Sequence, residues 1–152
     1  MEHFSAFFTD AMLSLFQEML TYESMMLSQT EQMDISTGEA RLLWKIGPSP
    51  KTLSSLASEM GLTLPTMTVA VQKLQKKGYV LKERSKEDGR AVLISLTDKG
   101  KRMAHIYHYV QENAARGASA NFTEAEKEAF VSGLNKVNCY LKDRIEKMED
   151  KK

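Results

Sequence analysis

The polar side chains with the clearest chemical pattern lie on and just before a short helix that is expected to begin after Thr63. Small hydroxyl groups can approach base edges closely, the Gln72 amide can pair with adenine through two hydrogen bonds, and lysines neutralise phosphates. Pro65 fits there because first-turn amides lack helical partners. The candidate DNA-contacting residues are Thr63, Pro65, Thr66, Thr68, Val69, Gln72, Lys73 and Lys76. An ordinary solvated helix face is the alternative reading of this pattern.

A second group of basic residues falls on a predicted β-hairpin, or wing, that follows this helix. Residues 79–84 and 91–96 are β-prone, and Asp88-Gly89 between them is a common hairpin tip. A guanidinium at such a tip suits the negative potential of a narrow minor groove. The candidate contacts here are Lys82, Arg84, Lys86 and Arg90. Alternatively, Asp88 and Arg90 only pair with each other and stiffen the turn.

Charge is distributed unevenly along the 152 residues, although their formal net charge is only +1. From Lys51 to Arg102 there are 11 basic and 5 acidic residues, a net charge of +6, whereas the remainder has 10 basic and 15 acidic residues, a net charge of −5. A basic segment between acidic flanks is typical of a nucleic-acid-binding module. A winged-helix adaptor that binds only proteins would not need this excess charge.

Apolar spacing predicts the helices that must position these residues. Two short helices joined at Gly61 by a tight turn are typical of a helix-turn-helix, whose second helix enters the major groove. The expected buried sides are Leu53, Leu56, Ala57 and Met60 in the first helix, and Met67, Ala70, Val71 and Leu74 in the second.

Capping boxes mark the starts of two further helices, at Ser36 with Glu39 and at Thr123 with Glu126. The helix after Ser36 is expected to end at Gly47-Pro48 and to form the floor beneath the helix-turn-helix. Residues 49–51 are expected to be a linker. The predicted buried residues of this helix are Ala40, Leu43, Trp44 and Ile46.

Long amphipathic segments flank the central unit. Apolar residues from Phe4 to Leu27 recur mostly every three or four positions, which predicts a helix with a wide apolar stripe. A stripe from Phe130 to Met148 has nearly coiled-coil spacing, and both stripes are expected to pack within or between subunits. The five methionines between residues 12 and 33 are either core filler or the lining of a pocket for an apolar effector.

A helix capped by Thr97 is expected to follow the wing and to bend or break within residues 115–121. Its face carries His105, His108 and Glu112, which could supply part of a metal site, although a solvated flank explains the spacing equally well. Cys139 lies off the last apolar stripe and is either an incidental thiol or a redox sensor. No cofactor is expected.

Several motifs resemble the MarR family of bacterial regulators, whose fold is a winged helix-turn-helix. They are Leu-x-x-Leu-Ala-x-x-x-Gly-Leu, Thr66-Met67-Thr68, Leu74-x-Lys76-Lys77-Gly78-Tyr79-Val80, Asp88-Gly89-Arg90 and Leu96-Thr97-x-x-Gly100. The resemblance implies a mainly α single domain over residues 1–152 with a small β-hairpin wing. The winged helix-turn-helix would span residues 36–100, flanked by dimerisation helices in residues 1–33 and 101–148.

The same resemblance assigns roles to particular residues. Thr66 and Thr68 would read the major groove, and Arg90 would enter the minor groove. Val69 departs from the family pattern, because many members have arginine there, so contact with a thymine methyl replaces a hydrogen bond. The implied partners are a second copy of the chain, a pseudopalindromic operator in double-stranded DNA, and a small apolar or aromatic effector.

The resulting prediction is a homodimeric transcriptional repressor, with a protein-interaction adaptor or a metal- or redox-sensing regulator as alternatives. Asp34-Ile35-Ser36-x-x-Glu39 and the Thr-Met-Thr helix resemble the branch that represses fatty-acid synthesis genes, whose co-ligand is an acyl chain on its carrier protein. Enzyme motifs such as a phosphate-binding glycine loop are absent, which argues against catalysis. The single cysteine, and the lack of a secretory signal or membrane-spanning run, lead us to expect a cytoplasmic protein.

Overall fold

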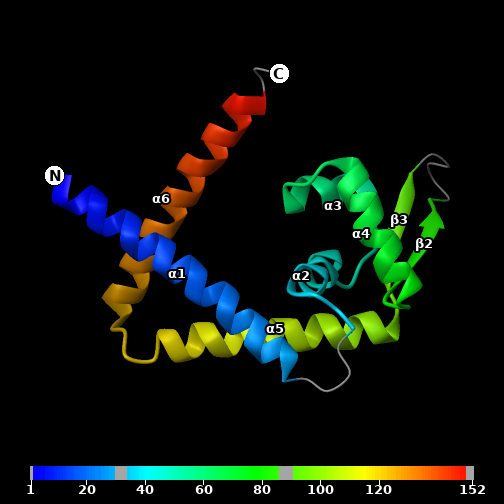
Figure 1. The fold of residues 1–152 in the computed structure, drawn as a ribbon, viewed down its shortest axis with the longest axis horizontal. Coiled ribbons are helices and arrows are strands. Elements are labelled where there is room, and N and C mark those ends of the chain that lie inside the picture. Colours follow the sequence, from blue (N-terminus) through cyan, green and yellow to red (C-terminus); the bar gives the residue numbers. More distant parts are fainter. Residues whose placement is uncertain (1, 30–33, 86–90, 150–152) are drawn as a thin grey trace. The chain divides into compact units, whose positions relative to one another are not determined.

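The computed structural model describes residues 2–29, 34–85 and 91–149. It is mainly helical with one small antiparallel sheet, which confirms the predicted fold class (Figure 1). The elements are α1 (Glu2–Ser28), α2 (Thr37–Ile46), β1 (Lys51–Thr52), α3 (Leu53–Met60), α4 (Leu64–Lys76), β2 (Val80–Arg84), β3 (Val92–Leu96), α5 (Asp98–Ala118) and α6 (Glu124–Glu149). The chain divides into two compact units, Met1–Glu112 and Asn113–Lys152.

The sheet has the strand order β1-β3-β2, with both pairings antiparallel. Strands β2 and β3 form the predicted hairpin, with Val80 opposite Leu96 and Arg84 opposite Val92. The prediction that residues 49–51 form a linker was wrong at Lys51, which pairs with Ile94 and begins β1. A strand of two residues is too short to show the alternating pattern by which strands are predicted.

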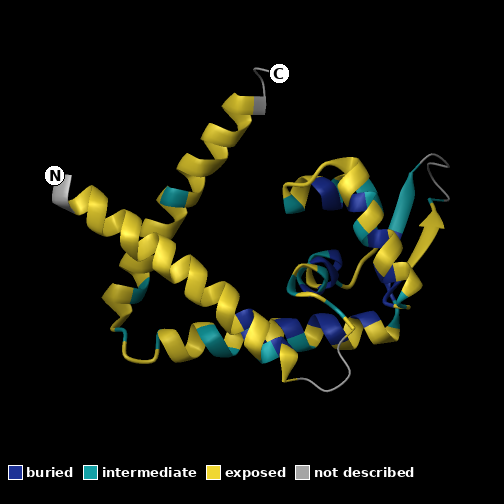
Figure 2. Ribbon diagram, viewed as in Figure 1, coloured by how far each residue is buried: buried dark blue, intermediate teal, exposed yellow. Residues whose placement is uncertain are grey.

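The main core lies inside the winged-helix unit, which we define as residues 37–96, together with the start of α5 (Figure 2). Helix α2 enters this core through Leu42, Leu43 and Ile46, each with at most 2% of its surface exposed. Trp44 was predicted to be buried, but 41% of its surface is exposed. Its ring instead stacks on His108 of α5, with centroids 6.1 Å apart, because position 44 lies at the edge of the buried face.

The predicted helix caps are confirmed. The Ser36 side chain accepts from the Glu39 amide while the Glu39 carboxylate accepts from the Ser36 amide. Thr123 and Glu126 form the second capping box in the same way. Gly61 ends α3 with φ +63°, a left-handed conformation that glycine adopts without steric cost. The interruption expected within residues 115–121 begins after Ala118, where α5 ends.

Large apolar side chains remain exposed along α1 and along α6 (Figure 2). On α1 they include Phe4, Phe7, Leu13, Phe16 and Met25, and on α6 Phe130, Leu134, Leu141, Ile145 and Met148. These residues belong to the two stripes that were predicted to pack within or between subunits, and that packing stays a prediction. Among the described helices, none combines the length and apolar character needed to span a bilayer.

Candidate nucleic-acid interface

Helix α4 presents its polar face outward because its opposite face is fixed in the core. Thr63 caps the helix with its side chain on the Thr66 amide, and Pro65 occupies the first turn. Met67, Val71 and Leu74 are buried with at most 1% of their surface exposed. The predicted contact residues Val69, Gln72, Lys73 and Lys76 therefore all lie on the exposed side.

The two threonines of the predicted reading surface differ in their availability. Thr66 is exposed, and its hydroxyl lies 2.8 Å from the Thr63 hydroxyl, so the two can act together at the helix start. Thr68 is half-buried, and its hydroxyl donates to the Leu64 carbonyl at 2.8 Å. Thr68 therefore keeps only acceptor capacity and its methyl group for contact with a base.

The wing carries its cations on β2. Only Val80 of this strand is buried, and Lys82 and Arg84 are exposed. The Ser85 amide donates to the Ala91 carbonyl at 2.9 Å and closes the hairpin below its tip. The predicted contact residues Lys86 and Arg90 lie outside the described residues.

A compact junction fixes α4 relative to the wing and to α5. The Thr97 amide donates to the Tyr79 carbonyl at 3.0 Å, and the Thr97 hydroxyl donates to the Gly78 carbonyl at 2.7 Å. Gly100 lies against this point so closely that a Cβ there would be 2.1 Å from the Tyr79 carbonyl oxygen. The exposed faces of α4 and β2 are therefore held together on one rigid unit.

Acidic residues near this junction are paired and do not cancel the charge of the contact surface. Lys77 Nζ lies 2.9 Å from Glu39 Oε2, and the Tyr79 hydroxyl donates to Asp34 Oδ1 at 2.6 Å. Within the described part of the chain, no carboxylate pairs with the four cations of the proposed interface. These cations are Lys73, Lys76, Lys82 and Arg84.

These contacts shift the pKa values of Tyr79, Asp34 and Glu39. Burial is the main reason that the pKa of Tyr79 rises to about 12, and the hydrogen bond to Asp34 adds to it. That same bond is the main reason that the pKa of the Asp34 carboxyl lies below its usual value. Burial opposes ionisation of Glu39, but hydrogen bonds from Ser36 and Lys77 outweigh it and lower its pKa.

The Asp34/Tyr79 and Glu39/Lys77 pairs were not predicted as contacts. A signal was present, since Asp34-Ile35-Ser36-x-x-Glu39 and Lys77-Gly78-Tyr79 are both motifs of the predicted family. The structure gives these motifs one shared role, because they join the start of α2 to the end of α4.

A groove of about 830 Å³ opens between α2 and α4. Thr66, Val69 and Lys73 of the contact surface line one side, and Arg41 lines the other. A smaller hollow of about 340 Å³ lies beside Trp44. His105 and His108 line that hollow, and His108 Nε2 lies 3.5 Å from Glu112 Oε1. The described residues bring no three potential metal ligands together.

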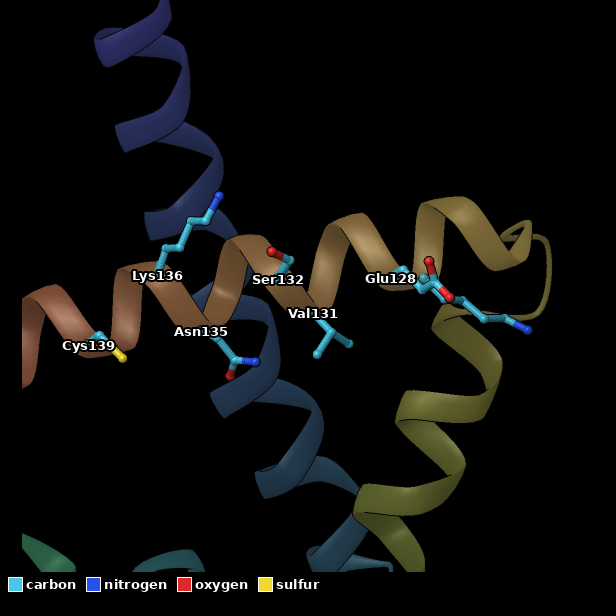
Figure 3. Close-up of a pocket in the computed structure, with 7 residues that line it drawn as sticks. Glu128, Val131, Ser132, Asn135, Lys136 and Cys139 are labelled. Atoms are coloured by element: carbon cyan, nitrogen blue, oxygen red, sulfur yellow. The ribbon is translucent and has the colours of Figure 1, made fainter.

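Cys139 is exposed and lies on α6 in the second unit. Figure 3 shows Val131, Asn135 and Cys139 on successive turns of this helix, along a surface hollow of about 630 Å³. The thiol is therefore accessible to solvent in this chain. Its suggested redox role stays a prediction.

Comparison with known proteins identifies the family. The family model described as "Transcriptional regulator SarA/Rot" matches residues 24–106, more than half of the chain. These residues include all of the winged-helix unit and its junction with α5. The family consists of transcriptional regulators, which confirms the prediction that the chain is not an enzyme.

Individual relatives agree with this assignment. The regulator YcgE of Bacillus subtilis is 27% identical over 101 residues, 66% of this chain and 65% of that protein, so the chain spans just under two thirds of this relative's length. Streptococcus pneumoniae FabT, solved in complex with DNA, is 27% identical with a TM-score of 0.86, over 91% of this chain and 98% of that chain. A MarR protein from Peptoclostridium difficile shares the fold with a TM-score of 0.75 at 22% identity, over 90% of this chain and 88% of that chain. The predicted MarR-type resemblance is confirmed, and the chain belongs to the SarA/Rot family of transcriptional regulators.

Proposed function

We propose that this chain is a homodimeric repressor that binds a pseudopalindromic operator in double-stranded DNA. The observation that carries the proposal is the exposed face of α4, where Val69, Gln72 and two lysines that pair with no described carboxylate lie on a helix anchored in the core. Helix α4 enters the major groove, and the wing follows the adjacent backbone. Arg90 reaches the minor groove from the wing tip. FabT, which has the same fold and was solved with DNA, supports this reading.

Each residue type on this surface has a distinct role. Gln72 and Thr66 hydrogen-bond to base edges, and Val69 contacts a thymine methyl. Lys73, Lys76, Lys82 and Arg84 bind phosphates, which sets affinity and orientation without reading sequence. Thr63, Pro65 and Thr68 shape the start of the helix, and Lys86 adds charge beside the wing tip.

A second copy of the chain covers the exposed apolar residues of α1 and α6. A dimer places two α4 helices on the same side of the DNA, with half-sites about one helical turn, or roughly 10 base pairs, apart. Binding to operator DNA also places the protein in the cytoplasm, where that DNA lies. A winged-helix adaptor that binds only proteins is disfavoured, because the cations on α4 and β2, which no described carboxylate pairs with, would have no ligand.

A small apolar or aromatic effector modulates this binding. The groove between α2 and α4 is one candidate site, because a ligand there would contact Thr66 and Val69 and so compete with DNA. The motif that resembles repressors of fatty-acid synthesis favours an acyl chain as the effector. Any such ligand must bind the DNA-bound and free states unequally in order to act.

Fluorescence anisotropy with a selected duplex tests the contact surface. Gln72→Ala should weaken binding by roughly 1–3 kcal/mol and relax base preference at one position of each half-site, because a bidentate base contact is lost. Gln75→Ala is the matched control, since Gln75 is exposed on the same helix but lies nearer its buried side. Equal affinity and base preference for Gln72→Ala and the native protein would place DNA readout elsewhere.

A further inference from the structure

Glu23 of α1 is a charged residue buried inside the first unit, with 4% of its surface exposed. Its carboxylate accepts three hydrogen bonds from two other helices. Arg41 Nη2 of α2 donates at 2.9 Å, and from α5 the Tyr107 hydroxyl donates at 3.1 Å and Gln111 Nε2 at 2.7 Å. Arg41 Nε also donates to the Tyr107 oxygen at 3.1 Å, which closes the cluster. We call these four residues the Glu23 cluster.

A buried carboxylate tolerates only arrangements in which its partners are present. Removing an ionised group from water is costly unless charged and hydrogen-bonded partners replace the water. The Glu23 carboxylate is satisfied only when α1, α2 and α5 keep their present mutual positions. The Glu23 cluster therefore favours one arrangement of these helices over other arrangements that would bury a similar amount of apolar surface.

Helix α1 buries few of its described apolar side chains. Its large apolar residues from Phe4 to Met19 are exposed, and Leu27 is its buried apolar residue within the described part. Leu27 packs against Ala40 and Tyr107, next to the Glu23 cluster. The apolar contact of Leu27 sets no particular angle, whereas hydrogen bonds are directional.

On the α2 side, the Glu23 cluster is connected to the proposed DNA-contacting surface through the core in which α2 and α4 pack. Arg41 lies on the same helix as Leu42 and Leu43, which are buried in the core that carries α4. Arg41 also lines the groove opposite Val69 and Lys73. A substitution at Glu23 therefore changes the link between α1 and α2 without changing any residue of the exposed α4 face.

We propose that Glu23 and Arg41 are positioning residues that set the distance between the two recognition helices of the dimer. The proposal rests on the proposed function, in which α1 contributes to the dimer and α4 enters the major groove. If α1 is held at one angle to α4, the dimer accepts one half-site spacing. If the Glu23 cluster is broken, the angle between α1 and α4 varies. The dimer then discriminates less between operators of different half-site spacing, although it recognises the bases of each half-site as before.

A spacer series measures this directly. A duplex that the native protein selects from a random library is compared with versions whose half-sites lie one base pair closer or farther apart. Glu23→Gln replaces a carboxylate oxygen with an amide donor that faces other donors. We expect this variant to lose roughly threefold to tenfold of the discrimination between spacers, the size typical of residues that couple distant sites. The effect of single-base changes within a half-site should stay the same.

Two further variants separate positioning from simple loss of stability. Tyr107→Phe removes only one hydroxyl from the cluster and should reduce spacing discrimination in the same direction by a smaller factor. Glu18→Gln is the matched control on α1, where Glu18 is exposed, and should leave discrimination unchanged. Unchanged spacer discrimination in folded Glu23→Gln and Tyr107→Phe, with a native preference present, would overturn the proposal. A native protein that selects no duplex would instead overturn the proposed function.

A measurement without DNA tests the same inference independently. Spin labels at Ser14→Cys on α1 and Gln75→Cys on α4, in a Cys139→Ser background diluted with unlabelled protein, report the distance between these helices. The native cluster should give one narrow distribution of distances, and Glu23→Gln should broaden or shift it. The same distribution in both proteins would show that the Glu23 cluster does not position α1.

Discussion

Glu39 illustrates how far a single residue could be understood from the sequence. The capping box with Ser36 was predicted, because its spacing is local and repeats in many helices. The pairing with Lys77 was not, since 38 residues separate the two and no local pattern links them. The residue therefore joins the start of α2 to the end of α4, beyond its predicted role at the helix start.

Replacing Glu39 with Gln should lower the free energy of unfolding at neutral pH. It should also make that free energy less dependent on pH. The folded-state pKa of Glu39 is lowered, so its contribution is present above its unfolded pKa and is lost as the pH falls through the folded value. We expect Glu39→Gln to cost about 1 kcal/mol at neutral pH, because Gln can keep the capping bond to Ser36 but loses the charge that pairs with Lys77. Thermal unfolding at pH 7 and at progressively lower pH measures the difference.

The variant and the native protein should converge in stability as the pH falls below about 4.5, the ordinary glutamate range. Glu128→Gln, an exposed substitution on α6, is the control and should follow the native curve. A constant stability gap between native protein and Glu39→Gln at every pH would contradict this account.

Trp44 shows where residue-level prediction failed. A tryptophan at helical spacing from Ala40 was reasonably assigned to the core, yet it stacks on His108 at the surface. Spacing places a residue on a side of a helix, but it does not tell how wide the covering partner is. The position of α5 decides this, and α5 lies more than 50 residues later in the chain.

At the scale of elements, helices and the wing were largely predictable. Their caps, apolar spacing and turns are local signals, and the expected boundaries of α2, α4 and the hairpin agree with the structure. The short strand β1 was missed because only its pairing with β3 defines it. The junction at Thr97 and Gly100 depends on contacts between separate elements, so its motif could be recognised beforehand but its geometry could not.

Gly100→Ala should disturb this junction more than its small size suggests. The added Cβ would lie 2.1 Å from the Tyr79 carbonyl oxygen, so the start of α5 must shift away from the wing. Overpacking of this kind costs about 1–3 kcal/mol. Chemical denaturation measures the free energy of unfolding.

Gly117→Ala in the same helix is the matched control, because nothing lies within 4 Å of its added Cβ. It should be neutral or stabilising by up to about 1 kcal/mol, since alanine favours a helix more than glycine does. Equal stability of both variants would mean that the close approach at Gly100 has no structural importance.

At the scale of the molecule, the uneven distribution of charge was the basis for predicting a nucleic-acid-binding module. This property can be read from the sequence because the charges of a segment stay with it when the chain folds. The structure adds that the acidic residues around the junction are paired with Lys77 and Tyr79 and not with the cations of α4 and β2. The Glu23 cluster could not be predicted, since Glu23 and Gln111 are 88 residues apart. The exposed faces of α1 and α6 were predicted as dimer surfaces and stay a prediction.

DNA binding should weaken steeply with salt. If Lys73, Lys76, Lys82 and Arg84 each bind a phosphate in both subunits, the logarithm of the binding constant should fall with the logarithm of salt with a slope of about −7. Lys76→Ala should make this slope shallower by about 2, because a dimer loses two contacts. Lys142→Ala on α6 is the control and should leave the slope unchanged; a slope near zero for the native protein would refute the role of these cations.

Selection of binding sites from random-sequence duplexes, at two salt concentrations, tests the central claim most directly. We predict that the purified protein enriches a pseudopalindrome whose half-sites lie about one helical turn apart, and that the yield falls at the higher salt. Salt-sensitive binding without an enriched motif, or no binding at either salt, would contradict the claim that this chain is a dimeric, sequence-specific repressor.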